Sequence, residues 1–202
     1  MRDFFFDLVD VLELVFLDPL RYSEEVQEIP FAASPISSWL FSVLAALSLS
    51  VGMSILSAPY TISTLSFLFF GFIANLILFR FFPFFYALVA DYYVQKKGRS
   101  QKLLFLLMFS RHSVVLFLLF APVSIVIHAV GLSGLGSGLL LLITFVFLYS
   151  LVVSRGLKSI YELRNRDSLR FSFYALGLTI LFPFLMNLYT ATSILQSISG
   201  GL

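Results

Sequence analysis

The sequence contains no cysteine, and this absence excludes disulfide bonds, thiolate metal sites and cysteine nucleophiles. Charged side chains are also scarce, at 12% of the 202 residues, against about 25% in a typical soluble domain. The two histidines, His112 and His128, are not at a metal-binding spacing, so we expect no metal site. Instead, 59% of the residues are hydrophobic, which predicts an integral membrane protein.

Negative charge is concentrated at the start of the chain. Residues 1–28 hold eight of the eleven acidic residues against two arginines, a balance of −6. The remaining chain has eleven basic and three acidic residues, a balance of +8. In an apolar chain such positive charge mainly sets the orientation in the membrane, so we expect no nucleic-acid partner. The acidic start lacks the features of a cleavable signal peptide, and we expect no processed form.

Three long stretches lack acidic and basic side chains apart from His128: residues 29–79, 113–154 and 171–202. A membrane-spanning helix needs about 20 mainly apolar residues. The stretches therefore predict an all-α integral membrane protein with five transmembrane helices, turned near residue 59 and at GLSGLGSG. The predicted spans are residues 36–57, 62–80, 113–128, 138–154 and 171–194, within a membrane domain of residues 36–202.

Basic residues lie in alternate connections between these spans. The turns near residue 59 and at residues 131–137 carry none, whereas residues 96–102 carry four and residues 155–170 carry five. Because Lys and Arg accumulate in cytoplasmic loops, we expect a cytoplasmic N-terminus and a C-terminus outside.

Arg80 stands in the aromatic run FRFFPFFYALVADYY, and its charge indicates where the membrane ends. Counted from Ile62, Arg80 comes after about 27 Å of helix, close to the edge of a hydrocarbon core about 30 Å thick. A charge at mid-membrane would cost at least about 2.5–3.5 kcal/mol. We therefore expect four arginines at matching cytoplasmic ends of their spans: Arg80, Arg111, Arg155 and Arg170.

Residues 81–110 are then predicted to continue the second and third helices as a cytoplasmic hairpin. Lys96 and Lys97 followed by Gly98 are typical of a helix end, and Pro83 allows a bend near the surface. Both arms are apolar nearly all round, so another segment or a partner must cover them. Phe84 and Phe85 are the candidate partner contacts.

Residues 1–35 are predicted to contain an amphipathic helix on the inner surface. Acidic residues recur at helical spacing on one side: Asp3, Asp7, Asp10 and Glu13. The other side is apolar and comprises Phe4, Phe5, Leu8, Val9, Leu12, Val15 and Phe16. We expect this side to lie on the hairpin or on lipid. Because the acids repel anionic headgroups, a protein surface such as the chain's own basic loops suits them better.

Three stretches resemble the Yip-type membrane domain, a family named for its interaction with Ypt and Rab GTPases. They are FLDPLRYSEEVQEIP, ADYYVQKKGRSQKLLFLLMFS and LYSLVVSRGLKSIYELRNRDSLRFSF, and the likeness covers roughly residues 11–185. The resemblance implies five spans, a cytoplasmic N-terminus, no cofactor and a role in membrane organisation or trafficking. The short N-terminal region resembles the bacterial branch, so we expect a bacterial cytoplasmic membrane, with the ER or Golgi as the alternative.

Two sites have a chemical character. Asp91 is the one acid in the apolar hairpin, and we expect either a functional carboxylate or a salt bridge to Lys96, Lys102 or a nearby arginine. The pair Arg111 and His112 suggests either a proton relay or lipid-phosphate site, or an anchor at the membrane surface.

Five cations follow the fourth predicted span: Arg155, Lys158, Arg164, Arg166 and Arg170. They set the topology, and cations at one membrane surface also bind anionic lipid, at about 1 kcal/mol each. We therefore regard them, together with Arg80 and Arg111, as candidate contacts to lipid or a partner.

These features favour a non-enzymatic membrane scaffold or adaptor that works through its hairpin, as a homo-oligomer or with a partner membrane protein. The alternative is a small transporter or transporter subunit with a polar path near Asn75 and Asn187. A third hypothesis, an intramembrane enzyme, requires His112, Asp91 and a serine within hydrogen-bond reach.

Overall fold

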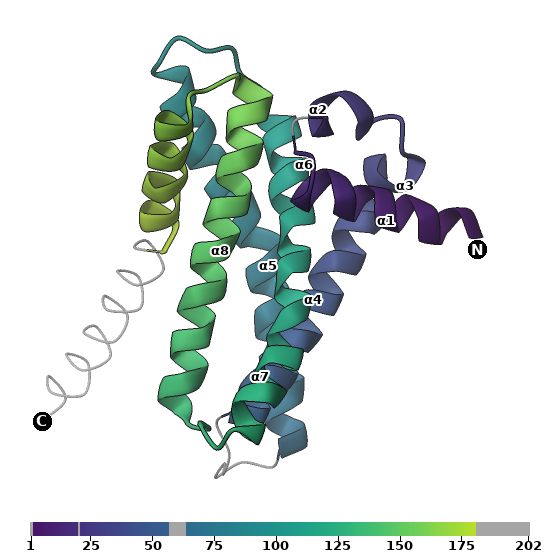
Figure 1. Cartoon of the computed structure of the whole chain (residues 1–202), viewed down its shortest axis with the longest axis vertical. Helices are drawn as coiled ribbons and strands as arrows, with labels where there is room; N and C mark the ends of the chain where they lie inside the picture. The colour runs from purple at the N-terminus through teal and green to yellow at the C-terminus, as the bar shows by residue number, and fades with distance from the viewer. Residues whose placement is uncertain (1, 20, 57–63, 181–202) are drawn as a thin grey trace, which may run out of the picture.

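The computed structural model describes residues 2–19, 21–56 and 64–180, which are mostly helical and contain no strand. A helical stretch over residues 165–180, called helix 165–180 below, follows the other elements. Figure 1 shows the long helices side by side, with α1 lying across them. The elements are α1 (Arg2–Phe16), α2 (Tyr22–Glu25), α3 (Pro30–Ala33), α4 (Pro35–Leu56), α5 (Thr64–Gln95), α6 (Leu103–Ser113), the 3-10 helix η1 (Val114–Leu119), α7 (Phe120–Ala129) and α8 (Leu135–Tyr161).

Four helical segments in the described part of the chain are long and apolar enough to cross a membrane: Pro35–Leu56, Leu68–Gln95, Leu103–Ala129 and Leu135–Tyr161. This confirms the prediction of an all-α membrane protein. Of the predicted fifth span, residues 171–180 are helical, and residues 181–194 lie outside the described residues. The turn predicted near residue 59 also lies outside them.

α5 is a single helix of 32 residues, which corresponds to a length of about 48 Å. Pro83 lies inside it and removes one backbone donor, but it does not end the helix. The chain leaves the helical conformation at Gly98, whose φ of 77° favours glycine and whose N–H donates to Gln95 O at 2.8 Å. The helix stop predicted here is therefore confirmed, and α6 begins only at Leu103.

Two glycines allow helices to approach closely. A Cβ at Gly156 on α8 would lie 2.4 Å from the ring of Phe109, a fully buried side chain of α6. A Cβ at Gly52 on α4 would lie 2.5 Å from the ring of Phe120. These positions show the use of small residues that is common between membrane helices.

α1 packs on α3, α6 and α8 through its C-terminal half, where Val11, Leu14 and Val15 are buried. Phe5 and Val9, predicted on the packed side, are instead 61% and 41% exposed. The C-terminal half of α1 therefore packs on the bundle, and contact of Phe5 and Val9 with lipid, the other predicted surface, stays a prediction. The residues of α1 that are buried are those that contact neighbouring helices, and not all of them belong to the side opposite the acids.

We predict that Gly156→Ala destabilises the bundle, because the added methyl group must displace the Phe109 ring. Overpacking of this kind costs about 1–3 kcal/mol. The measurement is thermal unfolding of the purified protein in detergent. Gly136→Ala is the matched control, since Gly136 lies on the same helix with nothing within 4 Å of a new Cβ. Equal unfolding temperatures for the two variants would contradict the packing described here.

Candidate functional site

Arg80 lies beside the first turns of α4. Its Nη1 donates to Ser38 Oγ at 3.0 Å, and its guanidinium carbon lies 3.9 Å from the centroid of the Trp39 ring. Arg155 on α8 donates to the carbonyl oxygen of Phe16, at the end of α1, at 2.9 Å. Arg155 lies farther along the bundle than Arg80, because the hydroxyl of Tyr86, six residues after Arg80, contacts Ser150, five residues before Arg155.

Arg170 lies near the level of Arg155, because Ser172, two residues later on helix 165–180, bonds to Ser150, five residues before Arg155 on α8. Arg170 Nε donates to the Tyr174 hydroxyl at 2.7 Å, and the Tyr174 ring lies 5.5 Å from the ring of Tyr93 on α5. Tyr93 follows Arg80 by about 20 Å of helix. The prediction that the four arginines share one level is therefore wrong for Arg80, which lies about 16 Å of helix before the level of Arg155.

His112 is buried, at 2% exposure, between α2, α4 and α6. Its Nδ1 lies 2.7 Å from the Tyr22 hydroxyl, and its Nε2 lies 3.0 Å from Ser37 Oγ. The predicted surface anchor is thus an internal contact that holds the N-terminal segment on the bundle. Neighbouring Arg111 is half-buried, and its Nε has no hydrogen-bond partner within the described residues.

Asp91 is also buried, at 2% exposure, near the end of α5. Its carboxylate accepts hydrogen bonds from the Tyr161 hydroxyl, from the Gln95 side-chain amide at 2.5 Å and from the backbone N–H of Lys102 at 3.4 Å. The expected salt bridge is not found, since the ion pairs of the described chain do not include Asp91. Lys102 Nζ donates instead to the carbonyl oxygen of Ile160 at 2.8 Å. Asp91 therefore joins the ends of α5 and α8 to the turn before α6.

Hydrogen bonds between tyrosines and serines, which the sequence did not predict, link α5, α6, α8 and helix 165–180. The Tyr86 hydroxyl contacts Ser150 Oγ at 3.1 Å and bonds to Ser172 of helix 165–180. Tyr149 donates to the carbonyl oxygen of Ser110 at 3.0 Å. The only available signal was the presence of serine and tyrosine in otherwise apolar helices, which does not specify the partners.

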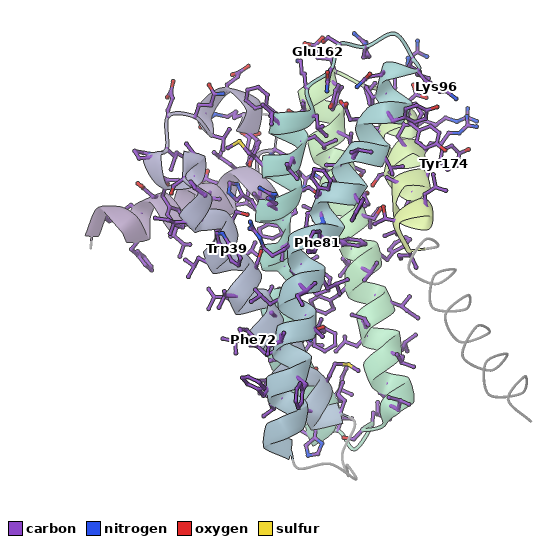
Figure 2. The ribbon with its side chains drawn as sticks, turned by 180° about the vertical axis from the view of Figure 1, so that it is seen from behind. Trp39, Phe72, Phe81, Lys96, Glu162 and Tyr174 are labelled. Carbon is purple, nitrogen blue, oxygen red and sulfur yellow. The ribbon has the colours of Figure 1, made fainter. Side chains whose placement is uncertain are left out.

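One side of α5 remains uncovered in the part that follows Arg80. We call this the α5 outer face, and its side chains have exposed fractions between 37% and 58%: Phe81, Phe84, Phe85, Leu88 and Tyr92. Their spacing places them on one side of a helix. The opposite side, with Tyr86, Ala87, Ala90 and Val94, is fully buried. Figure 2 shows Phe81 on the outside of the bundle and Lys96 beyond it, near the end. The α5 outer face thus contains both predicted contacts, Phe84 and Phe85.

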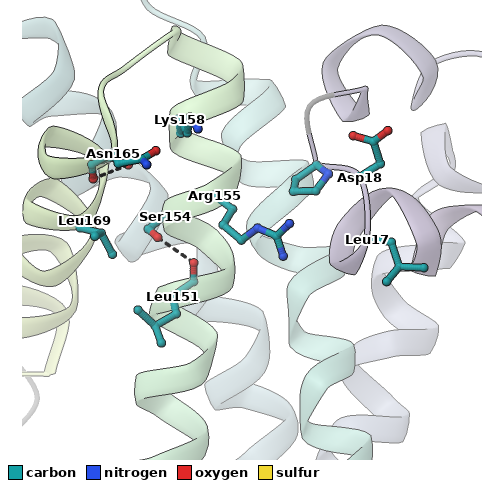
Figure 3. Close-up of a pocket in the computed structure, with 10 residues that line it drawn as sticks. Leu17, Asp18, Leu151, Ser154, Arg155, Lys158, Asn165 and Leu169 are labelled. Carbon is teal, nitrogen blue, oxygen red and sulfur yellow. Dashed lines mark hydrogen bonds between the residues drawn. The ribbon is translucent and has the colours of Figure 1, made fainter.

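The predicted cluster of five cations divides into two sites. Arg164, Arg166 and Arg170 line an open pocket of about 610 Å³ at the end of the bundle, together with Lys97 and Asp167. The hydrogen bond from Lys97, at 2.6 Å, lowers the pKa of the Asp167 carboxyl. Figure 3 shows the other two cations, Arg155 and Lys158, which line a separate groove on α8.

The residues required for a transporter or an intramembrane enzyme make other contacts in the structure, or lie outside the described residues. Asn75 donates to Ser50 Oγ at 3.0 Å in the contact between α4 and α5, and Asn187 lies outside the described residues. His112 and Asp91 belong to separate hydrogen-bond networks, so the constellation required for an intramembrane enzyme is not assembled. Within the described ranges, no three His, Asp or Glu side chains form a metal-binding group.

No protein-family model, curated protein or solved structure matches this chain. The likeness to the Yip-type domain therefore rests on the three sequence stretches alone.

We predict that Asp91→Ala loosens the turn between α5 and α6, because three donors lose their acceptor. Leaving the buried Tyr161 hydroxyl unpaired costs about 1–3 kcal/mol. The expected result is faster trypsin cleavage after Lys96, Lys97 and Arg99, measured on the protein in detergent.

The control is Asp167→Ala, which removes the ion pair to Lys97 near the same turn. Because the side chain of Asp167 is partly solvated, we expect only a small change in cleavage rate. Similar rates for the two variants would show that Asp91 does not hold the turn.

Proposed function

We propose that the protein is a non-enzymatic membrane scaffold or adaptor of the Yip-domain type, acting through protein contacts at the cytoplasmic face of the membrane. The observation that carries this proposal is the α5 outer face, a row of aromatic and aliphatic side chains left uncovered by the bundle. The side chains of Asp91 and His112, which suggested other chemistry, are engaged in internal hydrogen bonds.

The position of the arginines supports placing this face outside the hydrocarbon core. Arg80, Arg111 and Arg155 lie about 24, 27 and 30 Å of helix from the opposite ends of their segments, at Thr64, Ala129 and Leu135. These lengths agree with a hydrocarbon core about 30 Å thick. On this placement the outer face of α5 extends from the edge of the core, at Phe81, to about the level of Arg155, at Tyr92, since Tyr86 contacts Ser150.

An exposed apolar row on a helix is a docking surface for another helix. The outer face contains no carboxylate, and the cations Arg80 and Lys96 flank it, so it suits an amphipathic helix that carries acids. The α1 helix of a second copy has this chemistry: Phe5 and Val9 are exposed, with the exposed acid Asp10 beside them. We therefore propose a second copy as the partner.

The absence of cysteine permits a direct test by single-cysteine crosslinking. Two differently tagged copies, one with Val9→Cys and one with Leu88→Cys, are coexpressed and oxidised in membranes. We expect a disulfide-linked pair that contains both tags. Adding Phe84→Ala and Phe85→Ala to the second copy is expected to lower its yield at least tenfold.

Phe69→Ala with Phe70→Ala provides the matched control, because this second pair of adjacent, exposed phenylalanines also lies on α5 but before Arg80. The control should leave the crosslink unchanged. Recovery of monomers alone, or an equal loss with both double variants, would refute the proposed scaffold contact.

A further inference from the structure

A groove on α8 combines cations with apolar side chains in a way that the scaffold role does not require. It has a volume of about 420 Å³ and lies between the connection from α1 to α2, the α8 helix and the start of helix 165–180 (Figure 3). This volume is within the range typical of ligand sites, about 300–1,000 Å³. Three separate segments therefore form its walls.

Two cations on one side of α8 line the groove. Arg155 and Lys158 are three residues apart and exposed, so they project from neighbouring turns. The bond from Arg155 to the Phe16 carbonyl orients its guanidinium, which has further N–H donors for an anion. No ion pair within the described chain involves Lys158. With Asp18 as the one acid in the lining, the groove carries a net charge of +1.

The groove also has an apolar lining. Leu151 lies one helical turn from Arg155 in the direction of Leu135, and Leu169 faces the same space from helix 165–180. The site therefore offers both cations and hydrocarbon, with the polar side chains of Ser154, Asn165 and Ser168 in the same lining. A soluble anion would use only the first of these features.

The level of the groove agrees with a lipid. Arg155 lies about 30 Å of helix from Leu135, which is the distance expected between one edge of the hydrocarbon core and the other. The cations are then level with phospholipid phosphates, while Leu151 lies at the depth of acyl chains. Basic pockets between membrane helices on the cytoplasmic side commonly bind anionic headgroups.

We propose that this groove binds an anionic glycerophospholipid with a hydroxyl-bearing headgroup, such as phosphatidylglycerol. The phosphate lies between Arg155 and Lys158, a headgroup hydroxyl donates to the Asp18 carboxylate, and the acyl chains pack on Leu151 and Leu169. This site is separate from the α5 outer face and does not depend on the scaffold contact.

The pocket at the end of the bundle serves as an internal comparison. Arg164 and Arg166 there provide the same number of cations, but their pocket lies at the far end of the bundle beside Lys97 and Asp167. Removing two cations from each site in turn therefore distinguishes specific lipid binding in the groove from a general effect of positive charge.

The test is native mass spectrometry of the purified full chain in a neutral detergent, with added phosphatidylglycerol, phosphatidylcholine or soluble glycerol 3-phosphate. We expect one tightly bound phosphatidylglycerol and no comparable retention of the other two compounds. Arg155→Gln with Lys158→Gln is expected to weaken binding about 30-fold. Arg164→Gln with Arg166→Gln is expected to leave it unchanged.

Because Arg155 also holds the end of α1, Lys158→Gln alone is a second variant that preserves the Phe16 contact. It is expected to weaken binding about fivefold, with an unchanged unfolding temperature in the absence of lipid. An equal loss with the two double variants, or equal binding of phosphatidylcholine, would overturn the site. Binding of glycerol 3-phosphate as tight as that of phosphatidylglycerol would show that the groove takes a soluble phosphate.

Discussion

The thickness of the hydrocarbon core is the constraint on which the rest of this architecture depends. α5 is about 48 Å long, whereas the core of a bilayer is about 30 Å thick, so about a third of this helix extends past it. A guanidinium at mid-membrane is costly, and we therefore infer from Arg80 and Arg155 which third projects. Apolar helix surface outside the membrane must then be covered. α6, α8 and helix 165–180 cover the inner side of α5, and its outer face is exposed in the described structure.

The most reactive-looking residues form contacts between helices in the interior of the bundle. Asp91, His112 and Tyr86 each bond to side chains or backbone of other helices and are almost fully buried. A buried polar group without a partner is expensive, so these contacts specify how the helices meet. On the surface, the α5 outer face and the groove beside Arg155 combine apolar area with flanking charge.

Charge alone was an accurate guide in some places and misleading in others. The helix stop at Gly98 follows from local chemistry, because two lysines and a glycine end a helix whatever surrounds it. Arg80 shows the limit of this reasoning, since a basic residue in a long helix need not lie level with the basic residues of its neighbours. Tyr86, six residues after Arg80, contacts Ser150, five residues before Arg155. Arg80 and Arg155, expected at one level, therefore differ by about 16 Å of helix.

The sequence by itself determined the class of protein, the long apolar helices and the helix stop at Gly98, because these depend on composition and on neighbouring residues. It also located the exposed pair Phe84 and Phe85, since a helix that is apolar all round must leave one side uncovered. Only the tertiary structure decided the partners of Asp91 and His112, and the division of the basic residues between two pockets. The physical reason is that hydrogen bonds and pockets join residues up to 139 positions apart, such as Arg155 and Phe16. Such pairs are set by how helices pack, and no local pattern records them.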